Sequence, residues 1–195
     1  MRLILVVVLL AGAAAAFVLV RHQDRIHEQN RLAAVASELA GRDVSVRCPG
    51  FLGSLVDVHG EAGRVQFDAE GRPADTTALS PETCKALKHL DRVDFACLDR
   101  GDCAYSEFKA GWAAHTLAHE AFHLRGYRDE AVTECYGFQN TAFVAERLGV
   151  ASDRAGKLQT WLFLEGYANE PQEYQSMQCA DGGALDLHPD SHSWP

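Results

Sequence analysis

Residues 119–134 read HEAFHLRGYRDEAVTE, and this stretch decides what the sequence indicates about fold and function. His119 and His123 are four positions apart, so on a helix they lie one turn apart on the same face. Their ring nitrogens can then converge on one Zn²⁺ ion at ~2.0 to 2.1 Å, while Glu120 is placed to act as general base on a water molecule. The pattern therefore predicts His119 and His123 as zinc ligands and Glu120 as the catalytic residue.

The sequence on either side of this pattern predicts a helical hairpin. A helical pattern runs from about residue 106 to 124 and is largely apolar around the two histidines, so both imidazoles are expected to be at least partly buried. Gly126 ends this helix, and a second helix is predicted over residues 129–148. The short connection makes the two helices a tight antiparallel pair.

The hairpin predicts a third ligand. The first residues of its second helix lie against the end of the first helix, which places Glu130 beside His123. Glu134, one turn further on, is then expected beside His119, where its carboxylate orients the imidazole ring. Two histidines and one carboxylate leave a fourth position open, as a catalytic zinc requires.

These residues resemble the gluzincin metallopeptidases, the thermolysin-like class, in which His-Glu-x-x-His is followed by a helix that reads Asn-Glu-x-x-Ser-Asp. Residues 129–134, Asp-Glu-Ala-Val-Thr-Glu, are similar to that second motif position by position. The resemblance covers about 16 of the 195 residues and implies a minimal zincin-like domain, with Glu130 as third ligand and Glu134 supporting His119. The arrangement is also similar to uncharacterised membrane-anchored bacterial proteins.

Two alternatives remain open on the same residues. Residues 119–129 also read His-Glu-x-x-His-x-x-Gly-x-x-Asp, which resembles the metzincin variant with an aspartate as third ligand, here Asp129. Met177 would then supply the methionine that metzincins place beneath the metal. The second alternative is a catalytically inactive zinc-binding scaffold outside the cytoplasm, although a closed structural site has no use for Glu120.

Composition and cysteine content restrict the class of protein further. The formal charge of −9 gives no basis for binding a phosphate backbone, so no nucleic-acid partner is expected. Six cysteines suit three disulfides in an oxidising compartment. Cys97 and Cys103 are the clearest pair, and Cys135 is expected to bond a cysteine such as Cys179 rather than zinc, while about 15 connectivities are formally open.

The N-terminus predicts membrane targeting. Leu3 to Val20 is a run of 18 residues without a charge, which as a helix spans ~27 Å. We therefore interpret residues 1–21 as a transmembrane anchor that places a single-pass protein in the cell membrane with its globular part outside the cytoplasm. The alternative is a signal peptide that is cleaved near its alanines to release a secreted protein. Residues 22–41 are predicted to be a helical stalk, 42–180 the zincin-like domain and 181–195 a flexible tail.

The remaining pattern predicts an α+β fold, mainly helical, with a small antiparallel sheet and one N-terminal transmembrane helix. Alternating apolar residues predict short strands at 43–46, 55–58 and 65–67, and Ser80-Pro81 begins a helix that extends to about Leu90. A last helix is predicted over 152–165.

Peptide hydrolysis also needs a group that stabilises the developing negative charge. Four tyrosines are candidates that the sequence does not separate: Tyr127, Tyr136, Tyr167 and Tyr174. His115 is expected to be a supporting or rim residue rather than a ligand. The sequence thus predicts an exported zinc-dependent metallopeptidase that acts on a peptide or protein substrate.

Overall fold

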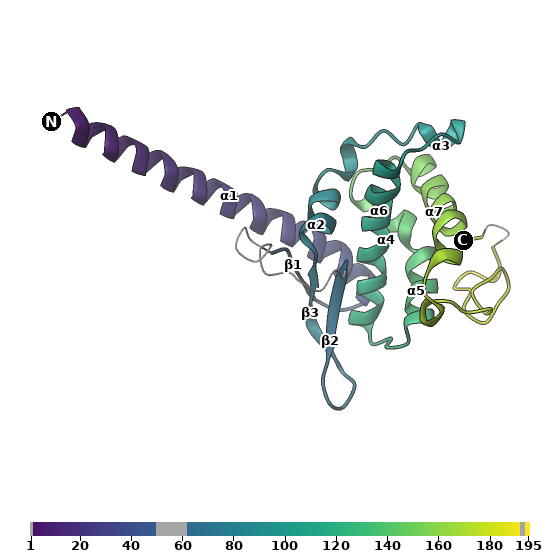
Figure 1. The fold of residues 1–195 in the computed structure, drawn as a ribbon. Helices are drawn as coiled ribbons and strands as arrows, with labels where there is room; N and C mark the ends of the chain where they lie inside the picture. Colours follow the sequence, from purple (N-terminus) through teal and green to yellow (C-terminus); the bar gives the residue numbers. More distant parts are fainter. Residues whose placement is uncertain (1, 50–61, 192–193) are drawn as a thin grey trace.

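A computed structural model describes residues 2–49, 62–191 and 194–195. A long N-terminal helix leads into a small sheet, and a group of helices packs beside that sheet (Figure 1). The main elements are α1 (Arg2–Ala40), β1 (Ser45–Arg47), β2 (Gly63–Phe67), β3 (Pro73–Leu79), α2 (Pro81–Lys88), α3 (Cys97–Arg100), α4 (Tyr105–Arg125), α5 (Glu130–Gln139), α6 (Thr141–Arg147) and α7 (Ser152–Gly166). The described residues also form the 3-10 turns η2 (Leu90–Arg92), η3 (Tyr167–Asn169) and η4 (Gln172–Tyr174).

Helix α4 is the centre of the molecule. Helices α1, α2, α5, α6 and α7 and strands β2 and β3 all contact it. Most of its length is buried on every side, which is typical of a helix enclosed in a core. Small residues permit this close packing; at Gly111, for example, a Cβ atom would lie 2.7 Å from a methyl group of Leu158 on α7.

Helix α1 belongs to the core through its last turns. Leu32, Val35 and Ala36 are buried there, and the helix contacts both β1 and α4. It ends at Gly41, whose backbone has φ +68°, a conformation that glycine adopts without strain. The predicted stalk, residues 22–41, is therefore continuous with the part of α1 that precedes it.

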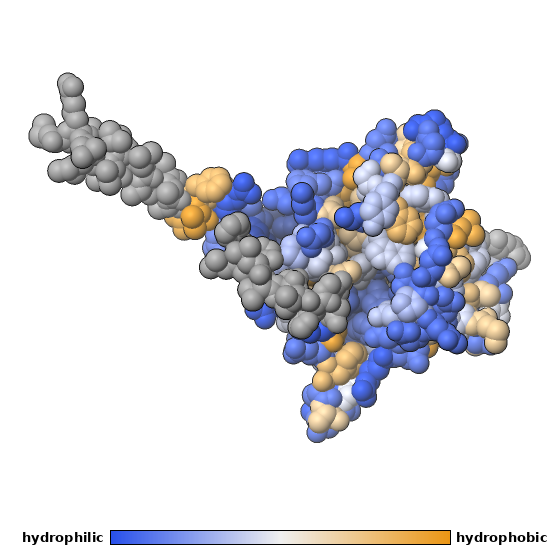
Figure 2. All heavy atoms as spheres, viewed as in Figure 1, coloured by the Kyte–Doolittle hydropathy of each residue, from blue (hydrophilic) through white to orange (hydrophobic). Residues whose placement is uncertain are grey.

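The prediction of a transmembrane helix is wrong. Among the residues that the structure describes, none forms a helix long and apolar enough to cross a membrane. Helix α1 runs without a break from Arg2 into the turns that pack in the core. An exposed apolar band at residues 17–20 lies along this helix, and Figure 2 shows it in orange.

The sheet is mixed, so the prediction of an antiparallel sheet is also wrong. Its strand order is β1-β3-β2, with β1 parallel and β2 antiparallel to β3. The central strand, β3, was not predicted because small and hydroxyl side chains replace the apolar alternation that identifies a strand. The predicted strands at 43–46 and 65–67 overlap β1 and β2, and the one at 55–58 lies outside the described residues.

The helix predictions missed α3 and one break within a predicted helix. Ser80 caps α2 by accepting a hydrogen bond from the Thr83 backbone N–H, and Pro81 occupies the first helical position, as expected. The predicted helix at 129–148 is divided at Asn140 into α5 and α6. The last predicted helix corresponds to α7.

Three disulfides connect these elements. Two of them, Cys97–Cys103 and Cys135–Cys179, were predicted. The third, Cys48–Cys84, joins the chain after β1 to α2. The C-terminal residues lie against the helices, because Gln139 accepts a hydrogen bond from the Leu187 backbone N–H and Gln159 donates one to the Pro195 carbonyl.

The disulfides should differ in their contribution to stability, because a longer closed loop removes more entropy from the unfolded chain. The sequence separation is 44 for Cys135–Cys179 and 6 for Cys97–Cys103. Replacing both cysteines by alanine should therefore lower the free energy of unfolding by about 4 kcal/mol for the first pair and about 2 kcal/mol for the second. Urea denaturation measures both values, with peptide mapping of the unreduced protein as the control. A reversed order, or six free thiols, would contradict the assignment.

Candidate metal centre

The turn between α4 and α5 brings the predicted ligands together. Gly126 ends α4 in the left-handed region at φ +114°, which lets the chain reverse without strain. Asp129 is the N-cap of α5, and its carboxylate accepts a hydrogen bond from the Val132 backbone N–H. Because the two helices then run side by side, acidic residues on α5 face histidines on α4.

Gly137 sets how closely the two helices approach. A Cβ atom at this position would lie 3.1 Å from the Cα atom of His119 and 3.1 Å from Cε1 of His115. A Cβ atom there would be in tight contact with both histidines, so α5 or the histidines would have to shift by a few tenths of an ångström. The absence of a side chain at Gly137 therefore allows the carboxylates of α5 to reach the imidazoles.

Three atoms of the predicted ligand set converge at one point. His119 Nε2 and His123 Nε2 lie 2.9 Å apart. Glu130 Oε2 lies 3.1 Å from His123 Nε2 and 3.2 Å from His119 Nε2. The structure thus places His119, His123 and Glu130 together, with Glu130 the most exposed of the three at 37% of its side chain.

The hydrogen bonds on the other side of each ring determine which nitrogens carry protons. His123 Nδ1 lies 2.8 Å from the Tyr127 carbonyl oxygen, which can only accept, so Nδ1 carries the hydrogen. His119 Nδ1 lies 2.7 Å from Glu134 Oε2 and donates to that carboxylate. In their neutral forms both histidines therefore direct an Nε2 lone pair at each other and at Glu130.

Three lone-pair atoms at such short separations repel one another unless a positive charge lies between them. Burial would lower the pKa of His119, but the Glu130 and Glu134 carboxylates outweigh it and raise that pKa to about 10. Hydrogen bonds from His119 and His123 lower the pKa of Glu130 to about 2. A proton on His119 Nε2 supplies this positive charge, and a metal ion could replace that proton, because the spacing of the three atoms is close to the ~3.4 Å expected between tetrahedral ligands of one ion at ~2.1 Å.

A second group of side chains can also hold a metal ion, namely His115, His119 and Glu134, all of them buried. Glu134 Oε1 lies 3.0 Å from His115 Nε2, while Oε2 binds His119 Nδ1. Burial opposes ionisation of Glu134, but the charges and hydrogen bonds of the two histidines lower its pKa to about 2. Each carboxylate oxygen thus already accepts a hydrogen bond, whereas the first group directs lone pairs at a single point.

Glu120 lies beside the first group and beneath the sheet. Its Oε2 atom is 3.1 Å from Thr77 Oγ1 on β3. A Cβ atom at Gly63 on β2 would lie 2.6 Å from Glu120 Oε1, so the carboxylate fills the space that a side chain at residue 63 would need. The sheet therefore holds Glu120 from two adjacent strands.

The Thr77 hydroxyl can keep a hydrogen bond to Glu120 whether the carboxyl group is ionised or protonated. Its Oγ1 atom also lies 3.1 Å from the Arg64 carbonyl oxygen. A hydroxyl has one hydrogen, so Thr77 can donate it to an ionised Glu120, or donate it to Arg64 while accepting a hydrogen bond from a protonated Glu120. Burial raises the pKa of Glu120, which makes its carboxylate a stronger base than an exposed one.

A cavity of ≈ 480 Å³ opens onto these groups. Strand β2 lines one side of it, and Glu170 and Tyr174 from the C-terminal segment line another. The ring of Tyr174 lies 6.0 Å from that of His119. Burial and the nearby carboxylates of Glu130 and Glu134 raise the pKa of Tyr174 to about 12, so its hydroxyl keeps its proton and remains a donor.

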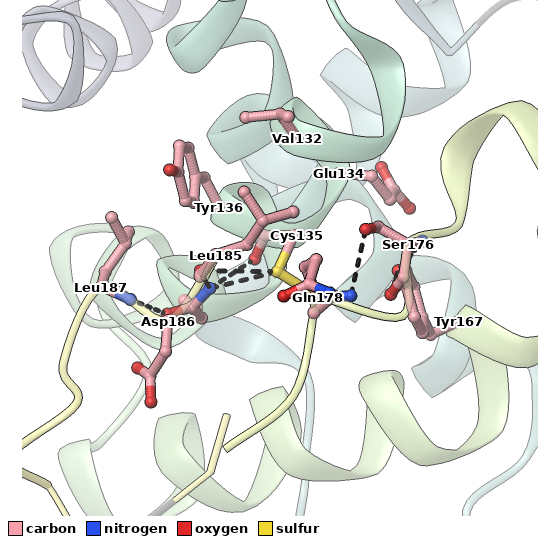
Figure 3. Close-up of a disulfide and its surroundings, with 12 residues drawn as sticks. Val132, Glu134, Cys135, Tyr136, Tyr167, Ser176, Gln178, Leu185, Asp186 and Leu187 are labelled. Carbon is pink, nitrogen blue, oxygen red and sulfur yellow. Dashed lines mark hydrogen bonds between the residues drawn. A yellow bond between two sulfur atoms is a disulfide. The ribbon is translucent and has the colours of Figure 1, made fainter. Parts of the chain in front are cut away.

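The C-terminal segment is fastened to the helices on both sides of Tyr174. Figure 3 shows Cys135 of α5 facing this segment, with Gln178 and Leu185 beside it. The Tyr167 hydroxyl accepts a hydrogen bond from the Ser176 backbone N–H at 2.7 Å and donates one to the Ser176 carbonyl at 3.2 Å. These contacts and the Cys135–Cys179 disulfide hold the Tyr174 wall of the cavity in place.

The structure places the other candidate residues differently. Tyr127 and Tyr136 pack with Phe122 rather than in the cavity, and Tyr167 is occupied with Ser176. Met177 is 96% exposed and does not lie beneath the histidines. The sequence did not indicate the parts of Thr77 and Gly63, and neither carries a local pattern from which their contacts with Glu120 could have been found.

The contact between Gly63 and Glu120 can be tested by adding one methyl group. Gly63→Ala should lower the free energy of unfolding by about 1–3 kcal/mol, because the buried carboxylate must move. In a Glu120→Ala background the same change should be neutral or slightly stabilising, because the space is free. Urea denaturation compares the four proteins. Gly156→Ala is the control, since nothing lies within 4 Å of a Cβ atom there. An equal loss in both backgrounds would contradict the contact.

Comparison with protein-family models, with curated proteins and with solved structures finds no match to this chain. What identifies the site is therefore its geometry, which consists of two facing imidazoles, a carboxylate at hydrogen-bonding distance from both, and a second, buried carboxylate beside them. This arrangement can hold a metal ion and place a base next to it.

Proposed function

We propose that this protein is an exported zinc-dependent metallopeptidase in which Glu120 acts as the general base. One observation carries the proposal: the lone pairs of His119, His123 and Glu130 converge next to a buried glutamate, at a cavity large enough for part of a peptide. A structural metal site is closed by its ligands and needs no neighbouring base. This combination of groups therefore favours hydrolysis.

Zinc is the metal that suits two imidazoles and one carboxylate with a fourth position open. His119, His123 and Glu130 would hold it, and Glu134 would support His119 from the other side of its ring. When bound, zinc acts as a Lewis acid that polarises a carbonyl group and makes a water molecule more acidic.

The chain's own residues supply the proton transfers. Glu120 accepts a proton from the attacking water and passes it to the leaving amine, while Thr77 keeps a hydrogen bond to its carboxylate in both states. Tyr174 also lines the cavity, and we assign its hydroxyl as the donor that stabilises the developing negative charge. Glu170 lies on the same wall.

Strand β2 favours a peptide as the substrate. It is at the edge of the sheet, and no strand in the described part of the chain pairs with its outer side. Residues 62–65 of this edge line the cavity next to Glu120. An extended peptide can add to such an edge through main-chain hydrogen bonds, which would bring one of its peptide bonds to the histidines.

We further propose that the domain works in an oxidising compartment outside the cytoplasm. All six cysteines are paired in three disulfides, a usage that is rare in reducing compartments.

The ligand assignment predicts an order of zinc affinities. Glu130→Gln should weaken zinc binding by more than about 100-fold, because it removes a ligand, and Glu134→Gln by about 10- to 100-fold, because it removes a support. Asp129→Asn should change the affinity by less than about 3-fold, since asparagine is also a good N-cap. Competition with a chelator measures all three dissociation constants. If Asp129→Asn is the most damaging, the metzincin arrangement is correct. If Glu134→Gln is, the ligand lies one turn deeper in α5.

The catalytic assignment predicts a separation of binding from turnover. Glu120→Gln should keep zinc affinity within about 3-fold and lower the hydrolysis of an unfolded, fluorescently labelled protein by about 10²- to 10⁴-fold, because it removes the base. Glu173→Gln, an exposed glutamate next to Tyr174, is the matched control and should change neither property. Unchanged turnover in Glu120→Gln would remove Glu120 from catalysis. Zinc binding without hydrolysis in the parent protein would favour a scaffold.

A further inference from the structure

His115 is a buried histidine outside the His-Glu-x-x-His pattern. It lies one turn before His119 on α4, and only 2% of it is exposed. Its Nε2 atom lies 3.0 Å from Glu134 Oε1, in the interior of the α4–α5 pair. A polar ring is costly to bury unless a specific partner accepts its hydrogen bond, and Glu134 is that partner.

We infer that His115 is a positioning residue for the metal centre, acting through Glu134 on His119. The inference rests on the proposed function, because it assumes that His119 Nε2 is a metal ligand. His115 occupies one oxygen of Glu134, so that the other oxygen is directed at His119 Nδ1. The orientation of the His119 ring, and with it the direction of its Nε2 lone pair, then depends on His115.

Each carboxylate oxygen of Glu134 accepts a hydrogen bond from a different histidine. Oε1 accepts from His115 at 3.0 Å, and Oε2 accepts from His119 at 2.7 Å. A carboxylate held at both oxygens cannot rotate without breaking one of these hydrogen bonds. Without His115, Oε1 would be a buried acceptor lacking its partner, and Glu134 could turn toward other donors and release His119.

The surroundings hold the His115 ring in this position. Phe138 stacks on it with ring centroids 4.0 Å apart, and Trp112 packs against it at 4.9 Å. Gly137 leaves just enough room, since a Cβ atom there would lie 3.1 Å from His115 Cε1. Nδ1 lies 3.4 Å from the Thr141 hydroxyl. A ring confined by packing on its faces is suited to holding a carboxylate in one direction.

An ion bound by His115, His119 and Glu134 together is the competing interpretation of the same residues. The distances favour hydrogen bonds, because each nitrogen faces a different oxygen of Glu134. His119 would also have to bind that ion through Nδ1 while its Nε2 faces His123 and Glu130. A positioning role requires one ion per chain, whereas the competing site would add a second.

Two substitutions of similar size separate positioning from packing. His115→Gln keeps a donor that can reach Glu134, and His115→Met replaces it with an apolar group. We expect zinc affinity within about 3-fold of the parent protein for His115→Gln and about 10-fold weaker for His115→Met, a loss typical of an outer support. His115→Phe keeps an aromatic ring beside Phe138 without the donor and should resemble His115→Met. If packing alone matters, Phe and Met should bind zinc as well as Gln does, which would overturn the proposal.

A double-mutant cycle tests whether His115 acts through Glu134. In a Glu134→Gln background, His115→Met should weaken zinc binding by less than about 2-fold, because the connection to His119 is already changed. An equal fold-loss in both backgrounds would overturn the proposal. Gln159→Leu, a buried residue bonded to the Ala142 backbone N–H, is the control for general loss of stability and should leave the affinity unchanged.

The bound metal gives a readout that does not depend on hydrolysis. In the cobalt-substituted protein, His115→Met should shift the visible absorption bands of the ion, and His115→Gln should not, because only the former frees the His119 ring. Metal analysis should find one ion per chain in every variant. Two ions in the parent protein, with one lost in His115→Met, would make His115 a ligand and overturn the proposal. A parent protein that binds neither zinc nor cobalt would overturn the proposed function as well, and the two failures are thereby distinguished.

Discussion

The close approach of α5 to α4 at Gly137 is the constraint on which the candidate site depends. It lets a carboxylate on α5 pass between two imidazoles of α4 and lets a second carboxylate meet the Nε2 atoms of His119 and His123. A side chain at 137 would require α5 or the histidines to shift by a few tenths of an ångström, which would lengthen these contacts. The close packing of α4 and α5 and the contacts of the candidate site therefore both depend on the absence of a side chain at Gly137.

Electrostatics explains why this arrangement needs a positive charge. Glu120 and Glu134 are almost completely buried, at 4% and 3% exposure, and Glu130 lies close by. Buried carboxylates are tolerated when donors or positive charge compensate them. Imidazole N–H groups compensate Glu134, the Thr77 hydroxyl contacts Glu120, and the point between His119, His123 and Glu130 holds either a proton on His119 Nε2 or a cation in its place. A metal ion at that point would relieve the repulsion and join the two helices.

The positions of the candidate ligands could be predicted from local spacing. The other contacts of the site depend on tertiary structure, which the sequence pattern does not reveal. His119, His123, Glu130 and Glu134 follow from helical periodicity and one short turn, so their relative placement could be expected. Thr77 and Glu120 are 43 residues apart and meet only because β3 crosses above α4. The selection of Tyr174 among four tyrosines depends on how the C-terminal segment folds back. The transmembrane prediction rested on a run of uncharged residues, and no helix in the described part of the chain is long and apolar enough to cross a membrane.

Cys135 directly follows Glu134, so the candidate site lies next to a disulfide bond. Its disulfide to Cys179 joins α5 to the segment that carries Tyr174. Before that bond forms, hydrogen bonds such as those of Tyr167 and Gln139 are left to keep the segment in place. The disulfide therefore fixes the segment that carries Tyr174 to α5 beside Glu134, so its reduction would leave only such hydrogen bonds to hold that part of the cavity lining.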